Sequence, residues 1–183
     1  MIPLDTIDNG WLQDTTVCPS PNYNERPATT IDLLVIHNIS LPPGTFGGPH
    51  ISELFTNCLD PEADPSFCDI ADLRVSAHIL IRRDGSCIQF VPFDMRAWHA
   101  GVSCWQGRTG CNDFSIGIEL EGADDIAFDD RQYEALIRIT KTLFAYYPSL
   151  SPATVVGHSD IAPGRKTDPG PAFDWQRYLG ALA

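Results

Sequence analysis

Residues 31–38 read IDLLVIHN, and the rest of the chain can be placed around this stretch. The run from Ile31 to Ile36 is apolar and partly β-branched, which is typical of a strand buried inside a sheet. Such a strand delivers His37 and Asn38 at its carboxyl end, and a loop, SLPPGTFGGP, follows. Because functional groups gather at strand ends and in loops, these two polar residues are candidates for a site.

A second strand is predicted over residues 115–121, SIGIELE. In this segment Ile116, Ile118 and Leu120 alternate with small or polar residues. Because successive side chains of a strand point to opposite faces, the apolar set would be buried and Glu119 would face the other way. Glu119 is therefore expected to point away from the apolar layer.

A hairpin is predicted over residues 75–91, VSAHILIRRDGSCIQFV. Two strand-like runs are joined there by Asp84-Gly85, and Asp-Gly is among the strongest short-range hairpin signals. A further short run at residues 154–156 leads into Gly157-His158. This run places a second histidine directly after a predicted strand.

A long amphipathic helix is predicted to begin at Asp129 or Asp130, either of which can cap its first turn. The residues at helical spacing are Tyr133, Leu136, Ile137, Thr140, Leu143, Phe144 and Tyr147. Residues 174–182 are expected to close the chain as a short helix. Strands and helices do not alternate regularly, so the sequence predicts an α/β fold with a central mixed β-sheet flanked by helices.

The length of the chain, 183 residues, and its 43% hydrophobic content suit one substantial core. We therefore expect residues 1–183 to form a single domain. Residues 19–30, PSPNYNERPATT, are rich in proline and polar side chains. Residues 1–30 are accordingly interpreted as an extended N-terminal lead-in, after which the fold proper starts.

The charge balance is strongly acidic: twelve Lys plus Arg stand against twenty-four Asp plus Glu, a formal net charge of -12. This field repels phosphate backbones and anionic membrane surfaces, so neither a nucleic-acid nor a membrane partner is expected. No stretch approaches the roughly 18 to 20 apolar residues of a membrane helix. The amino terminus, MIPLDTIDNGWLQD, lacks the pattern of a secretory signal. A soluble, monomeric, cytoplasmic protein is expected.

Six cysteines are present: Cys18, Cys58, Cys68, Cys87, Cys104 and Cys111. Reduced thiols are the default in a protein that is not exported, so disulfides are not expected. There is no C-x-x-C pair, and the spacing of Cys104 and Cys111 matches no common zinc module. A metal bound by cysteine is therefore not expected.

Other side chains could hold a catalytic metal. Zinc with an open coordination position supplies both a nucleophile and charge stabilisation for hydrolysis of an unactivated amide. His37, His158 and Asp168 are plausible ligands because they lie at a strand end, after a glycine and in a turn. Spacing alone does not select them, since the histidines are far apart and no H-E-x-x-H motif occurs. By residue type alone, His78 and His99 are equally plausible as ligands.

Five blocks of sequence carry a resemblance: VIHNISLPPGTFGGP, LRVSAHILIRRDGSCIQFVPF, RAWHAGVS, CNDFSIGIELEG and GHSDIAPGRKTDPGPAFDW. In this order they closely resemble the cytoplasmic 1,6-anhydro-N-acetylmuramyl-L-alanine amidases of cell-wall recycling. The match runs from about Trp11 to Tyr178. Those enzymes belong to the zinc amidase and peptidoglycan-recognition superfamily, so the resemblance implies a mixed sheet with flanking helices.

The resemblance also implies roles for individual residues. The zinc ligands of the family match His37, His158 and Asp168, and its catalytic carboxylate and lysine match Glu119 and Lys166. A carboxylate near zinc can take a proton from water and pass it to the leaving amine. A fixed positive charge beside the metal would stabilise the developing oxyanion.

Two neighbours compete with these assignments on residue type alone. Glu121 lies on the same face of the predicted strand as Glu119 and could be the acid/base group instead. Arg165 is next to Lys166 and is interpreted as a solvated charge. The resemblance favours Glu119 and Lys166 in both cases.

For substrate contacts, the resemblance points to four residues: Asn38, Arg74, the backbone of Ala77, and Trp98. Arg74 could pair with a carboxylate of the stem peptide, and Trp98 could stack on the sugar ring. Their alternative roles are a surface ion pair and a core indole.

The sequence departs from the family at two positions. A second carboxylate-binding arginine of relatives falls at Gly110, where the nearest arginine is Arg108, so peptide recognition could be altered. Ser159 replaces a residue that is often cysteine, which is expected to matter little because it is not a ligand.

The expected function is a zinc-dependent N-acetylmuramoyl-L-alanine amidase acting on soluble muropeptides, with preference for the anhydro sugar and no covalent intermediate. The rival hypothesis is a non-catalytic peptidoglycan-recognition module, because the superfamily fold also occurs without metal, and fold alone does not decide function. A pure binder would have no reason to keep three ligands together with Glu119 and Lys166. A cysteine hydrolase is a third option, but no cysteine falls in a recognisable nucleophile motif.

Overall fold

A six-stranded sheet crosses the centre of the molecule in the order β12-β5-β11-β6-β7-β3. The computed structural model describes residues 5–13 and 15–183. Its strands are β1 Ile7–Asp8, β2 Trp11–Leu12, β3 Thr16–Val17, β4 Tyr23–Asn24, β5 Leu33–Ile39, β6 Ile79–Ile81, β7 Cys87–Gln89, β8 Arg96–Ala97, β9 Cys104–Trp105, β10 Arg108–Thr109, β11 Ser115–Glu121 and β12 Val155–Gly157. Its helices are α1 His50–Phe55, α2 Asp130–Tyr146, α3 His158–Ile161 and α4 Trp175–Gly180, with short 3-10 turns η1 Pro65–Phe67, η2 Cys111–Asp113 and η3 Pro152–Thr154.

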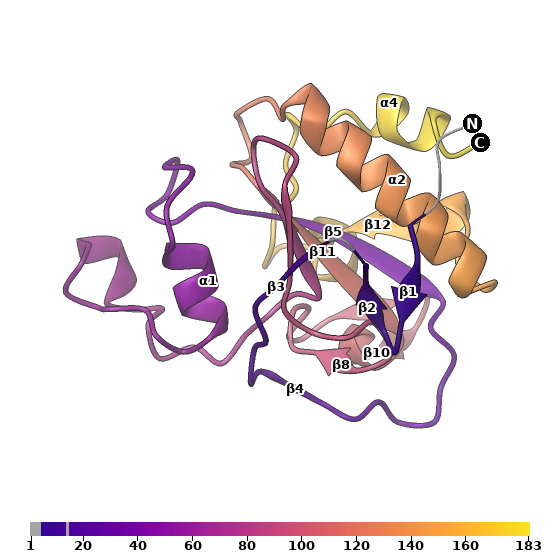
Figure 1. The fold of residues 1–183 in the computed structure, drawn as a ribbon, viewed down its shortest axis with the longest axis horizontal. Coiled ribbons are helices and arrows are strands. Elements are labelled where there is room, and N and C mark those ends of the chain that lie inside the picture. The colour runs from indigo at the N-terminus through magenta and orange to yellow at the C-terminus, as the bar shows by residue number, and fades with distance from the viewer. Residues whose placement is uncertain (1–4, 14) are drawn as a thin grey trace.

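The sheet is mixed. Strands β12, β5, β11 and β6 are parallel neighbours, β7 runs antiparallel to β6, and β3 runs parallel to β7. Figure 1 shows α2 and α4 lying together along one side of this sheet, whereas α1 lies apart from them, at the left of the view. The predicted α/β fold with a central mixed sheet and flanking helices is confirmed.

The two central strands bury different residues on their two faces. Leu34 and Ile36 of β5 join Ile116 and Ile118 of β11 in the core that packs against α2. Leu33 and Val35 of β5 belong to a second apolar cluster. Because side chains alternate along a strand, His37 and Glu119 share the face away from α2. The predicted orientation of Glu119 is confirmed.

The predicted long helix is α2, Asp130–Tyr146, and it begins with a capping box. The Asp129 carboxylate accepts a hydrogen bond from the amide of Arg131, and the Gln132 side chain accepts one from the amide of Asp129. These bonds satisfy backbone donors that a helix start leaves unpaired. Of the two acidic candidates, Asp129 is the cap. The hairpin is also confirmed: β6 and β7 pair antiparallel, with Gly85 in the turn at a φ of 82°.

The N-terminal segment is more integrated than the lead-in that the sequence suggested. Strands β1 and β2 form a small hairpin, and Leu12 is buried in the main core. Strand β3 pairs with β7 and forms one edge of the central sheet. The expectation that the fold proper starts after residue 30 is corrected by these contacts, because tertiary pairing recruits segments too short to show a periodic pattern.

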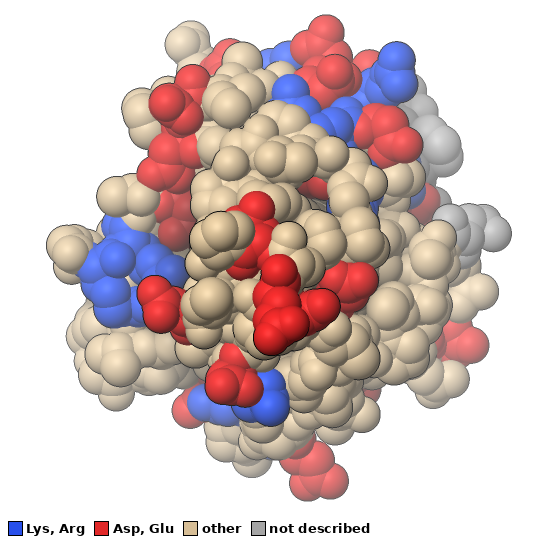
Figure 2. Space-filling model, turned by 90° about the vertical axis from the view of Figure 1, so that its left-hand side faces the viewer, with Lys and Arg blue, Asp and Glu red and all other residues tan. Residues whose placement is uncertain are grey.

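The acidic balance of the sequence is visible on the surface. Figure 2 shows acidic side chains in the middle of the face that α1 presents, with basic side chains towards its periphery. This arrangement differs from the clustered basic footprint of nucleic-acid binding. Among the described residues, no helix combines the length and the apolar character that crossing a membrane requires.

Candidate functional site

Three neighbouring parallel strands bring the candidate site residues into one row. In the register of β11 and β5, Glu119 lies opposite His37. In the register of β12 and β5, Gly157 lies opposite Ile36, so the next residue, His158, emerges beside His37 at the start of α3. The carboxyl ends of these strands therefore form one edge on which ligands from distant parts of the chain meet.

Three donor atoms converge at this edge. His37 Nδ1 lies 3.0 Å from His158 Nδ1 and 3.2 Å from Asp168 Oδ2, and His158 Nδ1 lies 3.0 Å from the same carboxylate oxygen. Their ligand atoms all lie within 4.8 Å of one another. Two imidazole nitrogens and a carboxylate oxygen in such an arrangement can hold a metal ion.

The remaining nitrogen of each histidine has its own partner. His37 Nε2 lies 2.9 Å from His99 Nδ1, and His158 Nε2 lies 3.1 Å from the carbonyl oxygen of Ala100. A carbonyl oxygen can only accept, so His158 donates through Nε2 and keeps its Nδ1 lone pair free for a metal.

The charge states of the triad suit a cation. Burial lowers the pKa of His37 to about 4, so its imidazole is neutral at pH 7. Burial works to raise the pKa of Asp168, but hydrogen bonds with His158 and His37 outweigh it and hold that pKa below its usual range. A neutral imidazole beside an ionised carboxylate is the protonation state that metal binding requires.

The loop that carries Asp168 is fixed from two sides. The amide of Ser159 donates to the Asp168 carbonyl at 3.0 Å. The side-chain amide of Asn38 donates to the Pro169 carbonyl at 3.0 Å and to Asp124 Oδ1 at 2.7 Å. Asn38 therefore positions the ligand loop, and among the described residues its Oδ1 is the atom left for a substrate.

Glu119 is 9% exposed and its Oε2 has no hydrogen-bond partner among the described residues. Burial and the nearby Asp168 charge raise the pKa of Glu119 well above its ordinary value, whereas Lys166 opposes that shift. An unpartnered, desolvated carboxyl group is costly to stability. Such a group beside a metal site can hold a proton at a higher pH than an ordinary glutamate does.

Glu121, the competing carboxylate, makes structural contacts instead. Its Oε1 accepts hydrogen bonds from the Arg82 guanidinium at 2.9 Å and from the Gly47 amide at 2.7 Å, and its Oε2 accepts one from the Arg83 amide at 3.1 Å. Glu121 is 1% exposed. It thus anchors the loop after β5 to the hairpin, and it is absent from the cavity that Glu119 lines.

Lys166 and Arg165 occupy different positions. Lys166 lines the cavity beside Glu119 and Asp168. Arg165 is exposed, as expected for a solvated charge, and its guanidinium also donates to the carbonyls of Ala100 and Val102, both at 2.7 Å. The turn places Arg165 against the loop after β8, whose carbonyls accept hydrogen bonds from its guanidinium.

The cavity at the metal triad has a volume of about 250 Å³. His37, Asn38, Ala77, Trp98, Glu119, His158, Lys166 and Asp168 line it, together with apolar side chains. The half-buried Trp98 donates through Nε1 to Asn24 Oδ1 at 2.6 Å, which orients its ring. Of the residues predicted from the sequence, only Arg74 lies outside this cavity.

An adjoining cleft contains Arg74, together with Trp98, Arg165 and Lys166. Among the described residues, the exposed guanidinium of Arg74 bonds only to the neighbouring Leu73 carbonyl, at 3.4 Å. Arg108, near the departure at Gly110, pairs instead with both carboxylate oxygens of Asp32 at 2.8 and 3.0 Å. Arg108 is therefore engaged with a carboxylate of the chain itself in this structure.

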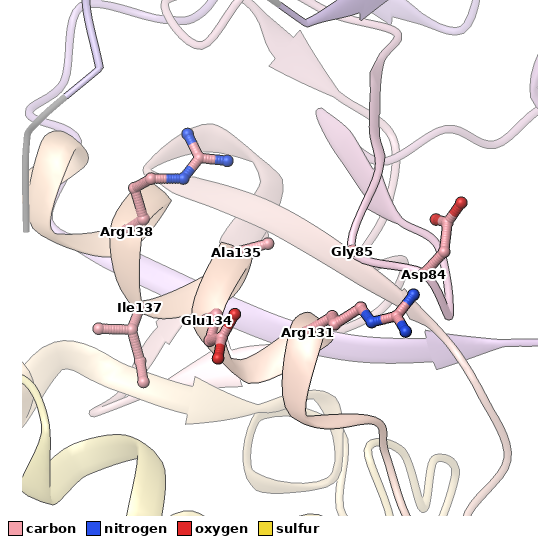
Figure 3. Close-up of a pocket in the computed structure, with 7 residues that line it drawn as sticks. All are labelled: Asp84, Gly85, Arg131, Glu134, Ala135, Ile137 and Arg138. Carbon is pink, nitrogen blue, oxygen red and sulfur yellow. The ribbon is translucent and has the colours of Figure 1, made fainter.

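A larger hollow, of about 550 Å³, lies between the hairpin turn and α2 (Figure 3). Its lining residues are Asp84, Gly85, Arg131, Glu134, Ala135, Ile137 and Arg138. Arg138 forms an ion pair with Asp5. None of the candidate ligands lines this hollow, so volume alone does not identify the functional site.

Sequence reasoning missed two residues that support the site. His99 was left as one histidine among several, and Asn112 was not singled out. His99 contacts His37, and Asn112 Oδ1 accepts hydrogen bonds from the amides of His99 and Ala100 at 3.1 and 2.8 Å. The sequence signals were the position of His99 in the block RAWHAGVS and that of Asn112 in the block CNDFSIGIELEG.

The comparisons with known proteins agree on one family. A model of the N-acetylmuramoyl-L-alanine amidase family matches residues 27–171. The 1,6-anhydro-N-acetylmuramyl-L-alanine amidase AmpD of Salmonella typhimurium strain SL1344 is 60% identical over 177 residues, covering 96% of this chain and 94% of the relative.

Solved structures give the same result. A crystal structure of a selenomethionine derivative of AmpD superposes with a TM-score of 0.95 at 57% identity, covering 97% of this chain and 99% of that one. The amidase AmiD of Escherichia coli, solved with anhydro-N-acetylmuramic acid-L-Ala-D-γ-Glu-L-Lys, gives a TM-score of 0.61 at 32% identity. That match covers 97% of this chain and 65% of AmiD.

Proposed function

The chain belongs to the N-acetylmuramoyl-L-alanine amidase family, and from this we propose that it hydrolyses the amide bond between N-acetylmuramic acid and L-alanine. Its substrates are soluble muropeptides of cell-wall recycling, preferably with the 1,6-anhydro sugar. The observation that carries the proposal is the meeting of His37, His158 and Asp168 beside Glu119 in one cavity. A binding module has no need of a desolvated, unpartnered carboxyl group there.

We propose zinc as the metal. Ligand atoms about 2.0 to 2.1 Å from a tetrahedral zinc ion lie roughly 3.3 Å apart. The donor atoms of His37, His158 and Asp168 are 3.0 to 3.2 Å apart, so the set fits that geometry. Two histidines and a carboxylate leave one position open, as in catalytic zinc sites. When bound, zinc lowers the pKa of water and stabilises negative charge on the amide oxygen.

Glu119 holds and moves the proton in this scheme. As a carboxylate it accepts a proton from the attacking water, and it then donates that proton to the leaving nitrogen of L-alanine. Its raised pKa brings proton uptake and release closer to neutral pH than an ordinary glutamate allows. Because Glu119 lies within β11, its backbone is held by strand pairing on both sides.

Lys166 supplies a positive charge that lines the same cavity. This charge works to lower the pKa of both Glu119 and His37, which supports its place near both groups. A cation there stabilises negative charge as the amide carbon becomes tetrahedral. Lys166 therefore acts mainly on the transition state.

Four residues are proposed to hold the substrate. Trp98 presents an aromatic surface for the sugar, and Arg74 offers a guanidinium for a stem-peptide carboxylate. Asn38 contributes its Oδ1, and the backbone of Ala77 lines the cavity. Asn38, Ala77 and Trp98 line the cavity of the metal triad, and Arg74 and Trp98 line the adjoining cleft, so a muropeptide bound to these groups would lie beside the triad.

We also propose that the protein works in the cytoplasm as a monomer. Supporting this location, all six cysteines are free thiols, as a reducing compartment would maintain.

The test is incubation of the zinc-loaded protein with a defined anhydro-muramyl tripeptide, followed by mass spectrometry. The proposal predicts two products, the free anhydro sugar acid and the intact tripeptide. A parallel reaction with the ordinary muramyl tripeptide measures the sugar preference. Binding of both compounds without cleavage of either would favour a recognition module.

A further inference from the structure

We propose that the dipeptide His99-Ala100, held by Asn112, is the element that positions both histidine ligands of the metal site. It makes one contact to each ligand, through a side chain on His37 and through a backbone carbonyl on His158. This inference rests on the proposed zinc centre and assigns positioning roles to residues outside the ligand set.

The first contact sets which nitrogen of His37 faces the metal site. His37 Nε2 and His99 Nδ1 are 2.9 Å apart, and His99 Nε2 lies 3.0 Å from Ser115 Oγ. A neutral imidazole carries its one proton on either of the two ring nitrogens. With that proton on Nε2 towards Ser115, His99 accepts from His37 Nε2. This leaves the His37 Nδ1 lone pair free for the metal.

The second contact leaves the Nδ1 lone pair of His158 free in the same way, but here the partner is a backbone carbonyl. The Ala100 carbonyl accepts from His158 Nε2 at 3.1 Å. The guanidinium of Arg165 donates to this same carbonyl at 2.7 Å. Ala100 is fully buried, so its carbonyl has a fixed direction. Outer partners of this kind fix the tautomer and the ring orientation of metal-bound histidines.

One side-chain oxygen binds both backbone amides of the dipeptide. Asn112 Oδ1 accepts from the amides of His99 and Ala100, at 3.1 and 2.8 Å, and Asn112 is 7% exposed. Gly117 leaves room for the ring of His99, because a Cβ atom at this position would lie 2.5 Å from two atoms of that ring. The glycine in SIGIELE is therefore needed for the close approach of His99 to β11.

The test measures zinc affinity of the full chain by competition with a chelating dye, and records the absorption spectrum of the cobalt-substituted protein. His99→Leu removes the acceptor for His37, and Asn112→Leu releases the dipeptide. Each should weaken zinc binding about 10- to 100-fold, as loss of outer partners typically does. Each should also alter the cobalt spectrum, which reports coordination geometry.

Two variants separate positioning from packing. His99→Asn keeps an acceptor oxygen near the place of Nδ1, so it should restore zinc affinity close to that of the parent. His78→Leu alters another buried histidine, whose Nδ1 accepts from the Gly117 amide and which makes no hydrogen bond to a ligand. It should lower the melting temperature and leave zinc affinity unchanged.

Zinc binding by His99→Leu at the parental affinity would overturn the inference, as would equal losses in His99→Leu and His78→Leu. If a leucine variant does not fold, His99→Asn still decides: a 10-fold or larger loss of affinity despite a parental melting temperature contradicts the proposed acceptor role. Failure of the parent itself to bind zinc would overturn the proposed zinc centre as well, which distinguishes the two failures.

Discussion

Glu119 lies opposite His37 in the parallel register of β11 and β5, and both side chains lie on the face of the sheet away from α2. Strand pairing therefore fixes the distance between the acid/base group and the first metal ligand. Sites built on strands are held more precisely than sites on loops. Lys166 and Arg74, by contrast, lie on exposed loops, so their roles are expected to be more tolerant of small shifts.

Glu119→Gln should keep the fold and the metal while losing about 10²- to 10⁴-fold in turnover, the usual contribution of a general acid/base group. Glu121→Gln should instead lower the melting temperature, because Arg82 and two backbone amides lose an ionised acceptor. Steady-state kinetics and thermal unfolding of both variants test this division. A larger loss of turnover at Glu121 would show that the wrong carboxylate is assigned.

The raised pKa of Glu119 predicts a pH-dependent stability difference in the metal-free protein. Well below pH 4.5, the ordinary pKa of a glutamate, both the folded and the unfolded chain hold the proton. As pH rises, the unfolded chain releases it first, so the parent loses stability until the folded-state pKa is reached. Glutamine does not titrate. The gain in free energy of unfolding from Glu119→Gln should thus increase with pH.

Urea denaturation between pH 4.5 and pH 8 measures this gain. A gain that stays constant or shrinks with rising pH would contradict the desolvated state of Glu119. The melting temperature of zinc-loaded samples is the control, because a bound cation favours the ionised carboxylate and should reduce the pH dependence.

Substitutions of Lys166 and Arg74 should affect different kinetic constants. Lys166→Ala should lower kcat with little change in KM, because its charge acts when the oxyanion forms. Arg74→Ala should raise KM with kcat largely retained, because a stem carboxylate is bound in both the ground and the transition state. Saturation kinetics on full and shortened muropeptides test this. A substrate without that carboxylate should abolish the effect of Arg74→Ala, and equal losses of kcat in both variants would refute the assignment.

The thiols offer a test of the reduced state. Cys58, Cys68 and Cys104 are exposed, whereas Cys111 is buried and burial raises the pKa of Cys87 to about 11. A thiol reagent should therefore label those three exposed cysteines first, and all six only after unfolding. Dithiothreitol with added zinc should leave the melting temperature nearly unchanged. A large drop under these conditions would reveal a disulfide, whose loss typically costs about 2 to 5 kcal/mol.

Local pattern was sufficient for the elements that carry the catalytic centre. Apolar runs or alternation predicted β5 and β11, Asp84-Gly85 predicted the hairpin, and the capping aspartate with helical spacing predicted α2. These signals are short-range, since each depends on residues a few positions apart. The two-residue strands β1 and β3 have no such periodicity, and their pairing depends on partners far along the chain.

The site residues likewise fall into those that the sequence predicted and those that only the fold reveals. Resemblance to a family supplied the triad, Glu119 and Lys166, whereas spacing could not have chosen His37 over His99. The roles of Arg165 and Asn112 depend on which carbonyls and amides the fold brings near them. A sequence does not display such contacts, so the carbonyl contacts of Arg165 were not predicted and Asn112 was overlooked.

The central claim is that one metal ion at His37, His158 and Asp168 enables this chain to hydrolyse the muramyl amide bond. The most direct measurement adds zinc in steps to the metal-free protein and follows cleavage of the anhydro-muramyl tripeptide against bound zinc. The account predicts cleavage that rises in proportion to bound zinc and levels off at about one ion per chain. Full cleavage by the metal-free protein, or none at one bound zinc per chain, would contradict it.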